Sequence, residues 1–133
     1  MNLQKFVLYA DDDSDDKEWA EDASQAVDHS LRLIFVDNGR QVLDFLSEKS
    51  IEGLLPSLIV LDLNMPELDG RQTLKKLKTH PLYQAIPVAI VTTSTNRIDR
   101  DVCTQLGAAV FLTKPDTHTE WQAVIRRLIP FIA

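Results

Sequence analysis

The sequence predicts a doubly wound α/β fold, and three observations support this prediction. Five short apolar runs are separated by segments whose apolar residues recur with helical spacing. Four of the five runs are almost continuously apolar, which is typical of parallel strands covered by helices on both faces. Strands and helices that alternate along a chain form one parallel sheet with right-handed crossovers.

The five apolar runs are the expected strands. Only the second contains an interior charge, Arg32, so we expect that strand to lie at an edge of the sheet. Five strands favour the flavodoxin-like order 2-1-3-4-5 over the six-stranded dinucleotide-binding type. In chain order the runs are 6–10, 31–36, 58–61, 88–91 and 110–112.

One helix is expected after each strand, five in all. The first follows the acidic run 11–16, the fourth follows Asn96, and Gly107 ends the fourth. Pairs spaced for a capping box begin the other three: Asn38 with Gln41, Asp69 with Gln72, and Thr117 with Glu120. The apolar faces are expected at Trp19, Ala23, Ala26, Val27; Val42, Phe45, Leu46; Leu74, Leu77; Ile98, Val102, Leu106; and Trp121, Val124, Ile125, Leu128, Ile129.

Composition excludes several classes of protein. The 133 residues fit a single domain, expected to span 1–133. Cys103 is the only cysteine, which rules out an internal disulfide and a cysteine-based zinc site, and which fits a cytoplasmic protein. The net charge of −6 without a basic stripe argues against nucleic-acid binding. The longest apolar run near the start is too short for a signal peptide or a membrane span.

Polar residues follow four of the strands, at the edge where a doubly wound sheet places its site. Asp11 and Asp12 follow the first strand, Asp62 the third, Thr92 the fourth and Lys114 the fifth. Strands one and three are neighbours in the expected order, so the three carboxylates should converge. Because such carboxylates repel one another, a hard divalent cation is expected among them, and Mg²⁺ suits a few carboxylates and waters.

Each of these residues also has an ordinary structural explanation. Aspartates favour helix starts, and we expect Asp13, Asp15 and Asp16 to act only as caps or dipole partners. The run also resembles the first half of a calcium loop, but Asp16 stands where that loop needs Gly. A lysine after a strand is often an exposed end; here Lys114 would face the acidic crevice, and the proline after it raises the chance of a cis peptide bond.

The constellation resembles the receiver domain of two-component response regulators over nearly the whole chain. The matching elements are Asp11-Asp12, Asp62, the stretch 65–70 (MPELDG), Thr92 and Lys114-Pro115. Within that family, the stretches 77–88 and 92–94 are similar to stand-alone regulators of phytochrome-type histidine kinases. The resemblance therefore implies one receiver domain without an output domain.

The resemblance implies a role for each matching residue. Asp62 would take a phosphoryl group from a kinase phosphohistidine. Asp12, Asp62 and the backbone carbonyl of Asn64 would ligate Mg²⁺, and Asp11 would hold the ion through water. Lys114 and Thr92 would contact phosphoryl oxygens. The remaining role, an aromatic switch, falls to Phe111, although a Phe in an apolar strand is also ordinary core.

The implied function is a signalling switch that catalyses only its own phosphorylation and dephosphorylation. Its expected partners are a histidine kinase or a phosphotransfer protein. The expected output surface consists of the fourth helix, the fifth strand and the fifth helix. Homodimerisation and phosphate relay stay open as outputs. The enzyme alternative is a Mg²⁺-dependent phosphohydrolase of the haloacid dehalogenase type. That class wants a second Asp two residues after the nucleophile, where this chain has Asn64. A degenerate receiver would lack the phosphorylation residues, all of which are present.

Overall fold

The sheet forms as expected, with five parallel strands in the order β2-β1-β3-β4-β5. The computed structural model describes residues 5–132; the ends of the expected 1–133 domain lie outside this range. The strands are β1 (Val7–Ala10), β2 (Leu33–Val36), β3 (Leu58–Leu61), β4 (Val88–Thr92) and β5 (Val110–Thr113). β2 lies at an edge, as Arg32 indicated, although Arg32 itself precedes the strand.

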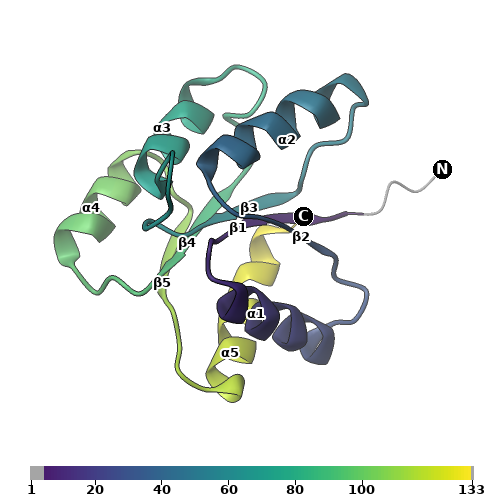
Figure 1. Ribbon diagram of the computed structural model, residues 1–133, viewed down its shortest axis with the longest axis vertical. Helices are drawn as coiled ribbons and strands as arrows, with labels where there is room; N and C mark the ends of the chain where they lie inside the picture. Colours follow the sequence, from purple (N-terminus) through teal and green to yellow (C-terminus); the bar gives the residue numbers. More distant parts are fainter. Residues whose placement is uncertain (1–4, 133) are drawn as a thin grey trace.

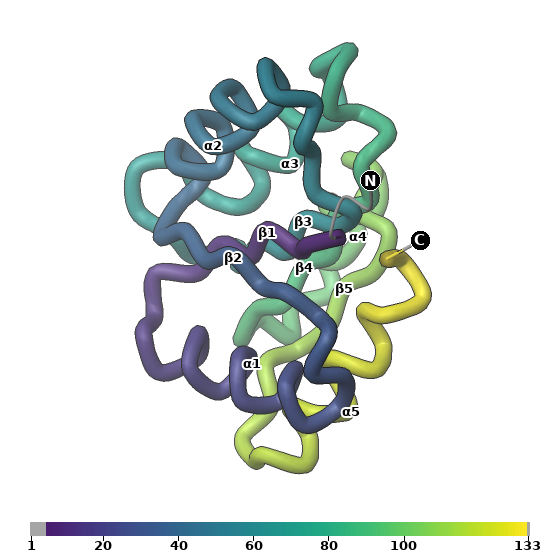
Figure 2. Tube along the Cα trace, turned by 90° about the vertical axis from the view of Figure 1, so that its right-hand side faces the viewer, coloured from purple at the N-terminus to yellow at the C-terminus, as the bar shows by residue number. Residues whose placement is uncertain are grey.

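Helices cover both faces of the sheet (Figure 1). They are α1 (Ser14–Val27), α2 (Gly39–Ile51), α3 (Gly70–Thr79), α4 (Arg97–Gln105) and α5 (His118–Leu128), followed by the short 3₁₀ helix η1 (Ile129–Phe131). α2, α3 and α4 pack on one face and α1 and α5 on the other, as the view in Figure 2 also shows for α1, α2 and α5. The molecule is therefore a three-layer sandwich with an apolar core on each side of the sheet.

Alternation along each strand divides the core between the two faces. In β3, Ile59 and Leu61 point toward α2 and α3, whereas Leu58 and Val60 point toward α1 and α5. Every residue of β1, β3 and β4 is buried, as expected for strands covered on both sides. The polar residues that follow these strands are consequently held on a rigid frame.

The expected cap residues begin α2, α3 and α5, but the full capping box forms only at α3. Asp69 and Gln72 form a reciprocal capping box at α3. At α2 and α5 only half of the box forms, because Gln41 accepts from the Asp37 N–H and Glu120 contacts the Thr117 hydroxyl instead of the cap N–H. The expected starts of these helices are confirmed. The possible cis bond before Pro115 is not found: residues 5–132 contain no cis peptide bond, so the Lys114–Pro115 bond is trans.

Two expected apolar faces are wrong in detail. On α4, Ile98 is 70% exposed, and Cys103 is the buried residue. On α1, Ala26 is exposed and Trp19 is only partly buried, because its ring lies against His118 of α5 with the ring centroids 3.9 Å apart. Trp121 is 2% exposed and is a core anchor as predicted.

The loop from β3 to α3 is held close to the strand end by Gly70. A Cβ at this position would lie 2.2 Å from the carbonyl oxygen of Asp62, so only glycine permits this approach. Within the same loop Glu67 adopts a left-handed conformation with φ of 65°. These two features fix where Asp62 stands relative to the first turn of α3.

No helix in the described part of the chain is long and apolar enough to cross a membrane.

Candidate functional site

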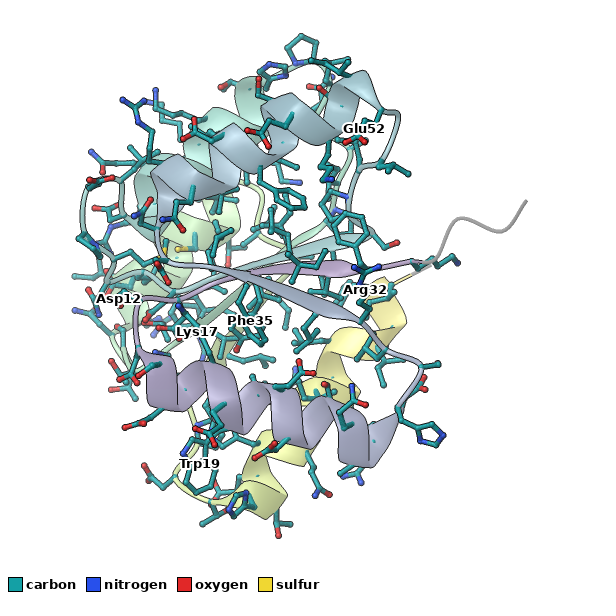
Figure 3. All side chains as sticks on the ribbon, turned by 45° about the vertical axis from the view of Figure 1, so that its right-hand side comes forward. Asp12, Lys17, Trp19, Arg32, Phe35 and Glu52 are labelled. Atoms are coloured by element: carbon teal, nitrogen blue, oxygen red, sulfur yellow. The ribbon has the colours of Figure 1, made fainter. Side chains whose placement is uncertain are left out.

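Three carboxylates converge at the carboxyl edge of the sheet. Asp11 follows β1, Asp12 comes next, and Asp62 follows β3; one oxygen from each lies within 4.8 Å of the others. Asp11 is fully buried, Asp62 is 5% exposed and Asp12 is exposed, so the cluster opens to solvent on one side. Figure 3 labels Asp12 at this edge, beside the start of α1. The predicted convergence is confirmed.

Lys114 is the cation of this cluster. Its Nζ lies 2.9 Å from Asp62 Oδ2 and 2.8 Å from Asp11 Oδ2, and its side chain is 7% exposed. The third partner is Asp16, whose Oδ2 lies 2.7 Å away. Asp16 was expected only to cap or to face the helix dipole, and that expectation is wrong. Its position in the first turn of α1 was visible in the sequence, but nothing there showed that this turn lies over the end of β5.

Burial and charge alter the proton affinities of the cluster. Burial, more than any other effect, raises the pKa of Asp11 to about 6, although Lys114 and the Asp13 N–H act against it. For Lys114, burial favours the neutral amine, but the hydrogen bonds to its carboxylates prevail and raise its pKa. Burial also raises the pKa of Tyr9, helped by the charges of Asp11, Asp16 and Asp62. The site therefore has an excess of negative charge.

The donor set fits a hard divalent cation. The Oδ2 atom of Asp11 is buried without a hydrogen bond of good geometry; its only close partner is the Lys114 ammonium at 2.8 Å. Asp62 has one oxygen directed at Lys114 and the other, Oδ1, accepting from the Asn64 N–H at 3.3 Å. A buried acceptor without a hydrogen bond, among carboxylates that outnumber the nearby ammonium, is a site that Mg²⁺ or Mn²⁺ would stabilise.

Thr92 and Phe111 were also expected to act at the site, and no hydrogen bond found in residues 5–132 joins Thr92 to the carboxylates of the cluster. Thr92 is fully buried at the end of β4, its hydroxyl oxygen 3.5 Å from the Ser94 N–H, and its carbonyl accepts from the Lys114 N–H at 2.7 Å. Phe111 is partly buried in β5, and the Arg100 guanidinium lies 5.5 Å from its ring centroid.

The loop after β4 is tied to two helices. Asp99 on α4 accepts from the Ser94 hydroxyl at 2.7 Å and from the Arg71 guanidinium of α3, also at 2.7 Å. Neither Arg71 nor Asp99 was expected near the site from the sequence. Asp99 therefore takes part in contacts with the rest of the molecule, whereas Ile98, one residue before it on α4, is exposed.

Comparison with known proteins shows the family to which the chain belongs. Residues 7–126 match the family described as the response regulator receiver domain. The chain is 32% identical over 117 residues to response regulator Rcp1 of Synechocystis, covering 85% of this chain and 78% of the relative. It superposes on the Mn²⁺-bound form of response regulator Rcp1 with a TM-score of 0.82 at 28% identity, covering 96% and 93% of the two chains. The bacteriophytochrome response regulator RtBRR gives 0.80 at 28% identity, with 95% and 78% covered.

Proposed function

Because this chain belongs to the response regulator receiver family, whose members are phosphorylation-regulated switches, we propose that Asp62 is its phosphoryl acceptor. One observation carries the assignment: a nearly buried carboxylate, 5% exposed, whose Oδ2 lies 2.9 Å from the Lys114 ammonium and which shares an acidic cluster with Asp11 and Asp12. No other carboxylate of residues 5–132 combines these features with a position after the third, central strand.

Mg²⁺ is the proposed cofactor, with Asp12, Asp62 and the Asn64 backbone carbonyl as ligands and Asp11 acting through water. When bound, the ion supplies charge neutralisation and orientation for phosphoryl transfer. The excess negative charge of the cluster supports this assignment. The similar response regulator Rcp1, whose structure is that of an Mn²⁺-bound form, supports it as well.

The chain's own residues perform the remaining tasks. A carboxylate oxygen of Asp62 attacks phosphorus while the phosphorus–nitrogen bond of a donor phosphohistidine breaks. Lys114 neutralises the phosphoryl oxygens from the side of β5. Thr92 then hydrogen-bonds another of these oxygens, which draws the loop after β4 toward Asp62. Phe111 follows as Thr92 leaves its place, and the surface of α4, β5 and α5 changes.

A histidine kinase or a phosphotransfer protein is the proposed donor. The similarity to a bacteriophytochrome response regulator supports a phytochrome-type kinase for this chain as well. The exposed Ile98 lies on α4, within the proposed output surface, and suits an apolar contact with a partner or a second copy. The net charge of −6 supports a protein over nucleic acid as the target.

Incubation with Mg²⁺ and acetyl phosphate, followed by intact mass measurement, tests the acceptor. We expect one phosphoryl adduct in the wild type and in Asp15→Asn, which removes a carboxylate that does not belong to the cluster. The adduct should be absent in Asp62→Asn and in the presence of a chelator. An adduct that persists in folded Asp62→Asn would refute the assignment, and sustained hydrolysis of a phosphomonoester would favour the phosphohydrolase.

A further inference from the structure

Asp16 contacts the ammonium group of Lys114 but does not belong to the group of carboxylates, Asp11, Asp12 and Asp62, that could hold a metal ion. Its Oδ2 accepts from Lys114 Nζ at 2.7 Å, the shortest of the three carboxylate contacts of that ammonium. In the described residues, the Lys114 ammonium donates hydrogen bonds to Asp16 and Asp62, whereas Asp11 is its partner through charge at 2.8 Å. Asp11 and Asp62 also belong to the set that would hold a divalent ion, whereas Asp16 does not.

The place of Asp16 is fixed by the structure of the first turn of α1. The Asp16 N–H donates to the side chain of the helix cap Asp13 at 3.2 Å. The next residue, Lys17, pairs with Asp37 in the loop that precedes α2. The turn is thus anchored on its own cap and toward β2, and Figure 3 shows Lys17 at the same end of the molecule as Asp12. A carboxylate on such a turn is preorganised to hold a flexible lysine.

Two of the three partners of Lys114 change when the site works. A bound cation would balance the negative charge of Asp11 and Asp62, and a phosphoryl group on Asp62 would turn one of its oxygens into the bridging oxygen of an acyl phosphate. The contact with Asp16 involves neither a member of the metal-binding set nor the acceptor carboxylate. A free lysine side chain loses rotamer entropy when it is ordered, and the Lys114 side chain is held in place with only 7% of its surface exposed.

We propose that Asp16 is a positioning residue that holds the Lys114 ammonium toward Asp62 in every state of the site. This inference rests on the proposed role of Asp62. It assigns Asp16 no contact with the metal or the phosphoryl group. In the step concerned, the bond from an Asp62 oxygen to phosphorus forms, the bond from phosphorus to the leaving group breaks, and Asp16 acts only through Lys114.

The test measures the initial rate of adduct formation against acetyl phosphate concentration, at saturating Mg²⁺. The leaving group is then acetate. Asp15→Asn is the matched control, because it removes the same charge from the same helical turn but from an exposed side chain. We expect Asp16→Asn to lower the maximal rate about tenfold, as is typical for groups that orient a functional residue. The half-saturating donor concentration should match that of Asp15→Asn.

A double-mutant cycle with Lys114→Ala separates positioning from a general charge effect. Asp16→Asn should have no further effect on the rate once Lys114 is removed. Asp16→Glu, which keeps the carboxylate, should recover most of the rate. Calorimetry without a phosphodonor supplies a readout other than activity: Asp16→Asn should bind Mg²⁺ with the affinity of Asp15→Asn.

The outcomes distinguish this inference from the proposed function. If neither wild type nor Asp15→Asn forms an adduct, the proposed function fails. If both form it and Asp16→Asn forms it equally fast, only the positioning role fails. The role also fails if the effect of Asp16→Asn persists in the Lys114→Ala background, or if folded Asp16→Glu is as slow as Asp16→Asn.

Discussion

Replacing Asp11 by Asn should stabilise the metal-free domain above neutral pH and have little effect in acid. Asp11 is fully buried, and burial raises its pKa from 3.8 to about 6. A pKa difference of one between the folded and unfolded states corresponds to about 1.4 kcal/mol, so the charged carboxylate costs about 3 kcal/mol of stability when it is fully ionised. Asn carries no charge, and its Oδ1 can still accept from the Asp13 N–H, which now donates to Asp11 Oδ1 at 2.9 Å.

Proton uptake sets the direction of this pH dependence. With a folded-state pKa above the unfolded value, the folded protein holds the proton more tightly. The stability due to Asp11 is therefore fully present below 3.8 and is lost as pH rises to about 6. The difference in the free energy of unfolding between Asp11→Asn and the wild type should therefore grow across this pH interval and stay constant above it. Its upper bound is about 3 kcal/mol, because the amide nitrogen of Asn cannot accept from Lys114.

Urea unfolding in a chelator, followed by tryptophan fluorescence across this pH range, measures the effect, since Trp121 is a buried reporter. Adding Mg²⁺ should remove the advantage of Asp11→Asn, because the ion compensates the charge in the wild type. Asp15→Asn, an exposed neighbour, should change stability by less than about 0.5 kcal/mol. Finding metal-free Asp11→Asn no more stable than wild type at about pH 8 would refute this reasoning, as would a difference between them that is independent of pH.

Two further substitutions test the surroundings of the site. Tyr9→Phe removes a hydroxyl that is fully buried without a hydrogen bond, and should be neutral or stabilising by up to about 1 kcal/mol in urea unfolding; a clear loss of stability would show that this hydroxyl has a partner. Gly70→Ala should cost about 2–3 kcal/mol and slow adduct formation, because the new Cβ would meet the Asp62 carbonyl oxygen at 2.2 Å. Its control is Gly53→Ala, where φ is +72° but no atom lies within 4 Å, with an expected cost of about 1 kcal/mol from backbone strain alone and normal adduct formation. Equal losses in the two glycine variants would contradict the argument from close approach.

The strands and the acidic cluster were predictable from sequence because their determinants are local. A parallel strand covered on both faces needs a continuous apolar run, and β1, β3 and β4 have one. The order of the strands then brings the residues that follow β1 and β3 together, so the meeting of Asp11, Asp12 and Asp62 could be derived without coordinates.

The contacts between layers could not be derived in the same way. Asp16 meets Lys114 across 98 residues of sequence, and the contact depends on how α1 tilts over the end of β5. On α4, likewise, Asp99 pairs with Arg71 of α3 while Ile98 lies exposed, and the local sequence pattern indicated neither. A short helix with one apolar residue per turn has no unique buried face until its neighbours are in place.

The buried carboxylate of Asp11 has a consequence for protein engineering. Residues that reduce stability where they stand are the first that a search for thermostable variants replaces, and Asp11 is such a residue whenever the search is made without a divalent cation. Libraries sorted by heat resistance would therefore become enriched in variants that fold well and have lost their cation dependence. For a domain of this kind, the acidic cluster should be held constant during redesign, and selections should be made with Mg²⁺ present.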